Sequence, residues 1–228
     1  MNHDLSFLLS SAIVFVGAHI MLSHPLRSLT TRFVGEKGFM AVYSLIALVS
    51  FGLMIHAFGQ SPRTGMIWDG WTAGPWIATS LLTIVAMALL IGSFVRNPAL
   101  PHPGAQQTAQ SREATGVFAV TRHPMMWAFA VWAVSHIIVS PNGRTIIFAG
   151  SLLFLALVGA ALQDLKKRAS MGEDWEAWQS RTRFWPDVSA LARLDWKLWA
   201  GAVVAWFAIT WVHLWFAYIP AGIWRWLV

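Results

Sequence analysis

Six long stretches without a charged side chain constrain this sequence more than any other feature. They cover Leu5–Leu22, Phe39–Phe58, Trp76–Val95, Met125–Val139, Ile146–Leu162 and Leu198–Ile219. A helix that crosses a bilayer needs about 20 mostly apolar residues. Only 11% of the residues are charged, against roughly a quarter in soluble domains. The sequence therefore predicts an all-α integral membrane protein with about six transmembrane helices, of which the fourth is the shortest.

The basic residues are concentrated in alternate connections between these helices. The second and fourth connections carry only Arg63 and Arg144, whereas the fifth alone carries Lys166, Lys167, Arg168, Arg181, Arg183, Arg193 and Lys197. Because Lys and Arg favour the cytoplasmic side of a membrane, we expect both termini to lie outside a bacterial inner membrane. This placement accounts for the net charge of +6. We therefore expect the lipid bilayer, and no nucleic acid, as the partner of the basic residues.

Two polar segments lie between the later helices. The Pro- and Gly-rich stretch at 96–116 predicts a mobile cytoplasmic loop. After the fifth helix, acidic residues precede basic ones, which predicts a short interfacial helix opening near Gly172 and ending before Pro186. Trp175 and Trp178 share one face of it and are expected in the headgroup region. We divide the chain into a multipass membrane domain at 1–187 and a Trp-rich C-terminal transmembrane helix at 188–228.

Four histidines stand inside the apolar runs, at His19, His56, His136 and His213. Ionisable groups inside a membrane usually face the bundle interior and serve an ion, a proton or a cofactor. The chain has no cysteine, which excludes thiolate ligation, and imidazole is a common axial ligand of haem. Three interpretations remain open: a haem site, structural histidines bonded to nearby carbonyls, and a proton or ion path.

The stretch TRHPMMWAFAVWAVSH, residues 121–136, combines two candidate sites. Met125, Phe129, Trp132 and His136 recur with helical spacing, so they form one face on which a histidine closes an aromatic wall, as a porphyrin pocket requires.

At the other end of this stretch, Pro124 suits the first position of a helix, which places Arg122 and His123 at the helix entry. Free N–H groups and a guanidinium there favour an anion such as a haem propionate, a cofactor carboxylate or a lipid phosphate.

Four motifs of the sequence resemble the NnrU family, which includes the 15-cis-zeta-carotene isomerases and bacterial proteins named for nitrite and nitric oxide metabolism. They are FVGAHIMLSHPLR, GEKGFMAVYSL, TRHPMMWAFAVWAVSH and GEDWEAWQSRTRFWP. The most specific feature is RHP followed by a histidine thirteen positions after its own. The resemblance runs from about Leu5 to Pro186 and leaves the Trp-rich tail outside.

The resemblance implies a multipass helical protein and, in its isomerase branch, a haem b held by two histidines. His19 and His136 match those two ligands, and His123 matches the histidine of the RHP element. Together with Arg27, Arg122, Phe129 and Trp132, His123 completes the set of residues that we expect to bind the cofactor.

Depth in the membrane complicates the pairing of His19 with His136. If the first helix ends at Leu22, the two residues lie about 15 Å apart in depth at 1.5 Å per residue. The difference falls if that helix continues past Leu22 towards Thr30. Otherwise His56 or His213 suits His136 better.

A second resemblance, to the isoprenylcysteine and phospholipid methyltransferases, overlaps the first. Their motif has Glu where this chain has Asp164, and tyrosines where it has Trp175 and Trp178; Trp127 also departs from it. We therefore expect a haem b-binding inner-membrane protein, acting either as a redox-controlled cis–trans isomerase of an apolar polyene or in nitrite and nitric oxide metabolism. The alternative is a methyltransferase-like protein that binds S-adenosylmethionine through Arg122, His123 and Asp164.

Overall fold

The computed structural model describes residues 3–228, and within them every regular element is a helix. In chain order these are α1 (His3–Ser23), α2 (Arg27–Gln60), α3 (Ala73–Ser93), α4 (Ala105–Ser111), α5 (Val117–Val120), α6 (Pro124–Val139), α7 (Gly143–Met171), α8 (Glu173–Arg181), η1 (Val188–Arg193), α9 (Trp196–Phe216) and η2 (Gly222–Trp226).

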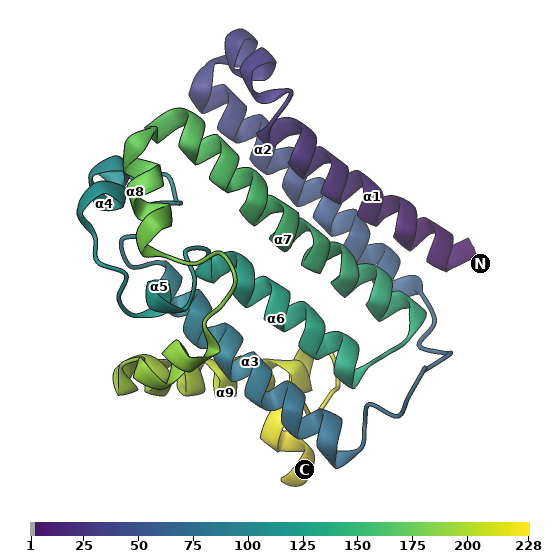
Figure 1. The fold of residues 1–228 in the computed structure, drawn as a ribbon. Helices are drawn as coiled ribbons and strands as arrows, with labels where there is room; N and C mark the ends of the chain where they lie inside the picture. Colours follow the sequence, from purple (N-terminus) through teal and green to yellow (C-terminus); the bar gives the residue numbers. More distant parts are fainter. Residues whose placement is uncertain (1–2) are drawn as a thin grey trace.

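Each of the six apolar runs forms most of one long helix, which confirms the prediction of an all-α multipass membrane protein. The helices α1, α2, α3, α7 and α9 are each long and apolar enough to cross a bilayer. The remaining helix, α6, is formed by the fourth apolar run and is shorter, with 16 residues. It packs between α3 and α7, while α1 and α2 pack together on the other side of α7 and α9 packs on α3 (Figure 1).

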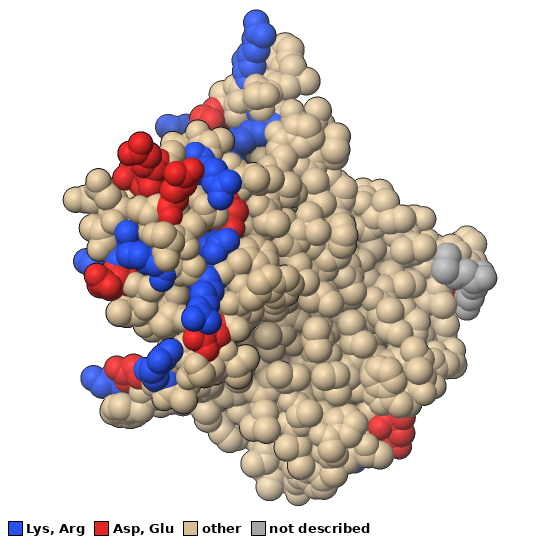
Figure 2. Space-filling view, in the orientation of Figure 1, with Lys and Arg blue, Asp and Glu red and all other residues tan. Residues whose placement is uncertain are grey.

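Hydrogen bonds between distant segments identify one end of this helix assembly. The hydroxyl of Ser61 donates to the Asp4 carbonyl at 3.3 Å, and the N–H of Ile67 donates to the Pro141 carbonyl at 2.9 Å. The Trp76 indole donates to the Gly222 carbonyl at 2.8 Å. Most charged side chains instead gather at the other end, over α4 and α8 (Figure 2). We call this the charged end.

At the charged end the structure corrects two expectations. Residues 96–116 contain α4, which packs against α8, and Arg181 donates to the Ala109 carbonyl at 2.5 Å. The expected mobile loop is therefore partly helical and anchored. Because α8 is covered in this way, Trp175 and Trp178 are fully buried in a core with Phe118, although we expected them in the headgroup region. The interfacial segment itself does form a helix.

The first two long helices meet in an elbow, residues 24–37. Helix α1 ends at Ser23 and does not continue towards Thr30. A turn over 24–26 leads into α2, whose helical geometry is interrupted at Gly35, with φ 70° and ψ 172°. That combination is essentially restricted to glycine. The elbow therefore consists of a turn, a short helix over 27–34, and the start of the long segment 36–60.

Candidate functional site

The RHP element forms a buried polar cluster between the start of α6 and α7. The Arg122 guanidinium donates to Asp164 Oδ2 from Nε at 2.9 Å and from Nη2 at 2.6 Å. His123 lies with Nε2 at 2.9 Å from Asp164 Oδ1 and Nδ1 at 3.1 Å from Gln163 Oε1. The side chains of Arg122 and Asp164 are 12% and 11% exposed, and that of His123 is fully buried. Most hydrogen-bond donors and acceptors of these side chains are therefore paired within the cluster.

The same cluster is joined to the segment that follows α8. The backbone N–H of Arg122 donates to the Arg183 carbonyl at 2.8 Å, and the Thr121 hydroxyl donates to the Phe184 carbonyl at 2.7 Å. The Trp127 indole donates to that carbonyl at 2.9 Å. This network fixes the entry of α6 to α7 and to the segment at 183–187.

The network changes the interpretation of Arg122 and His123 as ligand-binding residues. We expected the guanidinium fork to be open to an external anion, but Asp164 occupies it. An S-adenosylmethionine site built from Arg122, His123 and Asp164 would require this ion pair to open. The sequence analysis did not identify Gln163 as a member of this cluster. A signal was present, because Gln163 and Asp164 are the first polar residues after a long apolar run.

Three of the four histidines in the apolar runs share one local geometry. His19 Nδ1 lies 2.9 Å from the Phe15 carbonyl, His136 Nδ1 lies 2.8 Å from the Trp132 carbonyl, and His213 Nδ1 lies 2.8 Å from the Ile209 carbonyl. In each case Nδ1 acts as the donor, which leaves Nε2 as the nitrogen with a free lone pair. Across residues 3–228, no hydrogen bond joins these three Nε2 atoms to another group.

The structure does not bring His19 and His136 together. His19 lies beside Phe15 and Tyr43, with ring centroids at 4.3 and 5.5 Å, near the charged end of α1 and α2. His136 lies near the opposite end of α6, where its ring stacks on Trp132 with centroids 4.1 Å apart. Helix α7 packs against both α1 and α6 and separates them.

His213 is the histidine that the fold places near His136. The two imidazoles interact electrostatically, and α6 and α9 both pack on α3. An apolar hollow of about 440 Å³ lies at the same end of α9 and is lined by Trp211, Leu214, Trp215, Tyr218, Trp224 and Val228. His213 itself does not line it.

The other expected site residues are more widely spread. His56 is exposed on α2, Phe129 is 45% exposed on α6, and Arg27 pairs with Glu36 in the elbow. Within 3–228 no group of three or more His, Asp or Glu side chains is arranged to hold a bare metal ion. Two axial imidazoles on a porphyrin do not need such a group, because the macrocycle supplies the remaining ligands.

Comparison with known proteins identifies the family to which the chain belongs. The chain matches the NnrU protein family over residues 7–221, and no curated protein and no solved structure matches it. The match extends beyond Pro186, where we expected the resemblance to end, and includes α9. Because it covers most of the sequence, from α1 to the end of the last long helix, the chain belongs to the NnrU family.

Proposed function

We propose that this member of the NnrU family binds haem b in the membrane through His136 of α6 and His213 of α9. The proposal is carried by the electrostatic interaction between these two imidazoles and by the backbone carbonyl that holds Nδ1 of each ring. Histidines that bind metals usually donate their second ring N–H to a carbonyl or a carboxylate, which fixes the tautomer and the ring orientation.

The surroundings of these residues support an apolar cofactor. Trp132 stacks on the His136 ring and restricts its rotation, and aromatic and aliphatic side chains line the hollow at the same end of α9. Such aromatic and aliphatic surroundings suit a largely apolar plate. A bound haem supplies one-electron redox chemistry and an iron whose reactivity depends on its axial ligands.

Absorption spectra of the purified chain test the proposed ligands. We expect a Soret band in the oxidised protein, and sharp α and β bands after reduction with dithionite. His136→Ala and His213→Ala should each abolish the low-spin spectrum, because each removes one of the two residues that would hold the haem. His19→Ala and His56→Ala serve as matched controls and should keep it. A colourless protein expressed with ample haem, or loss of the spectrum in His19→Ala but not in His213→Ala, would contradict this assignment.

Within this proposal, the partner is a small molecule that reaches the site from the bilayer, either an apolar polyene or nitric oxide. Two assays separate these cases. A polyene substrate predicts a changed cis-to-trans ratio, measured by chromatography, that depends on the redox state and is lost in His136→Ala. Nitric oxide predicts a shifted Soret band on exposure of the reduced protein to the gas, without any isomerisation.

A further inference from the structure

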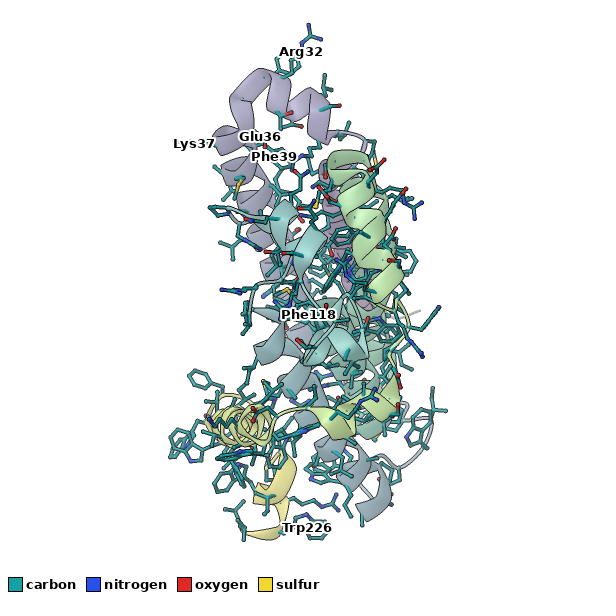
Figure 3. All side chains as sticks on the ribbon, turned by 60° about the vertical axis from the view of Figure 1, so that its left-hand side comes forward. Arg32, Glu36, Lys37, Phe39, Phe118 and Trp226 are labelled. Carbon is teal, nitrogen blue, oxygen red and sulfur yellow. The ribbon has the colours of Figure 1, made fainter. Side chains whose placement is uncertain are left out.

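The elbow between α1 and α2 exposes apolar side chains at the charged end of the molecule. Leu29 and Phe33 of its short helix are 53% and 78% exposed. Figure 3 shows Arg32 at the extreme of the molecule, with Glu36, Lys37 and Phe39 beneath it. Apolar and basic residues combined on a short helix are typical of segments that lie in a membrane interface. The elbow also sits where two membrane-spanning helices end, so the interface is within its reach.

Positive charge is in excess around the elbow. Arg27, Arg32 and Lys37 belong to the elbow itself, and Lys166 of α7 interacts electrostatically with both Arg27 and Glu36. Glu36 is the carboxylate of this group, and Arg27 occupies it at 2.9 Å. The elbow and Lys166 together therefore carry four cations against one carboxylate.

Lys166 is the cation of this group best placed to meet a ligand. It is half-buried, and no hydrogen bond joins its ammonium to any residue in the part of the chain that the structure describes, whereas the neighbouring Lys167 donates to the Pro98 carbonyl at 3.0 Å. Burial and the Lys166 ammonium lower the pKa of His24 in the turn. His24 is therefore neutral at pH 7 and contributes a ring but no charge.

An apolar groove of about 450 Å³ runs between α1 and α7. It is lined by residues that include Val16, Gly17, Gly150 and Phe154. Phe154 precedes Lys166 by twelve residues, or about 18 Å along the helix. That length is close to half the thickness of the hydrocarbon core of a bilayer, about 15 Å. A chain descending from Lys166 would therefore meet the groove near the bilayer centre.

We propose that the elbow and Lys166 bind the phosphate headgroup of an anionic phospholipid, whose acyl chain follows α7 to the groove between α1 and α7. Charge complementarity selects an anionic headgroup, because basic pockets between membrane helices are typical sites for such lipids. The exposed Leu29 and Phe33 select a lipid over a soluble anion, because they need an apolar phase beside the phosphate.

Lipid retention by the full chain tests the proposal. The purified protein is exposed in detergent to dioleoyl phosphatidylglycerol or dioleoyl phosphatidylcholine, and bound lipid is counted by native mass spectrometry. We expect the wild type to retain phosphatidylglycerol in preference. Lys166→Ala should bind it about fivefold more weakly, the ratio for about 1 kcal/mol per basic residue, and Lys166→Arg should restore binding.

The matched control is Lys197→Ala, because Lys197 is exposed at the start of α9 and remote from the elbow in sequence. It should leave the preference unchanged. An equal loss in Lys166→Ala and Lys197→Ala would reduce the effect to net charge and overturn the site. Full competition by millimolar inorganic phosphate would assign a soluble anion instead of a lipid and would also overturn the proposal.

A cysteine scan tests the elbow without any change of its charge. The native chain contains no cysteine, so Phe33→Cys can carry a single polarity-sensitive fluorophore. In phosphatidylglycerol vesicles we expect its emission to shift to the blue and to be quenched by shallow lipid-borne quenchers. The same label on Gln107→Cys, an exposed site on α4, should report water. Water-like emission from position 33 would contradict an elbow seated in the interface.

Discussion

At the scale of single residues, Asp164 holds the charged end of α6 and α7 together. Its carboxylate accepts from Arg122 and contacts His123, and both partners are nearly buried. Asp164→Asn keeps the size of the side chain and removes the charge, so the Arg122 cation would be left buried without a counter-ion. We expect a loss of about 3 kcal/mol in the free energy of unfolding, measured by denaturant titration in detergent micelles.

An exposed ion pair on the neighbouring helix provides the control for Asp164→Asn. Glu176 lies 4.0 Å from Arg168, and both side chains are more than half exposed. Glu176→Gln should therefore cost less than about 1 kcal/mol. Combining Asp164→Asn with Arg122→Gln should recover part of the lost stability, because the unpaired cation is removed as well. A cost in Asp164→Asn no larger than in Glu176→Gln would show that the cluster contributes no more than a surface pair.

At the scale of elements, the shape of the elbow depends on one glycine. Gly35 has a positive φ, and a Cβ built there meets no atom within 4 Å, so backbone strain is the main penalty for a side chain. Gly35→Ala should destabilise the protein by about 1–3 kcal/mol, or straighten the elbow and lower the preference for phosphatidylglycerol. Thermal unfolding and lipid retention measure these two effects.

The matched control lies in the long segment of the same helix. A Cβ on Gly52 also meets nothing within 4 Å, and its φ is not positive. Gly52→Ala should therefore stabilise the helix by about 0.5–1 kcal/mol through its higher helix propensity. Equal effects of the two substitutions would mean that the break at Gly35 stores no strain.

The sequence predicted the long helices well because each one must bury a charge-free run in lipid. It did not predict contacts that depend on tertiary packing. Trp175 and Trp178 carry the pattern of an interfacial helix, and they become buried because residues of several other elements, Phe118 among them, pack around them. In the sequence, Arg122 has the features of an open anion site. In the fold, its guanidinium pairs with Asp164, which lies 42 residues later in the chain. The proximity of His136 to His213 likewise depends on how α6 and α9 pack on α3.

At the scale of the whole molecule, charge and connectivity give one orientation in the membrane. Most Lys and Arg side chains lie at the charged end (Figure 2). The start of α1 and the end of the chain lie away from it (Figure 1). Because Lys and Arg resist translocation, we expect the charged end to face the cytoplasm.

Single cysteines in this cysteine-free chain measure that orientation. Thr64→Cys lies in the connection after α2 and Leu227→Cys near the C-terminus, whereas Gln107→Cys lies at the charged end, and all three positions are exposed. In intact cells a membrane-impermeant maleimide should label the first two and should reach Gln107→Cys only after permeabilisation. Labelling of Leu227→Cys together with Gln107→Cys would mean that α9 does not cross the bilayer. His213 and His136 would then no longer lie at the same depth in the bilayer. That result would therefore also contradict a haem held by both residues.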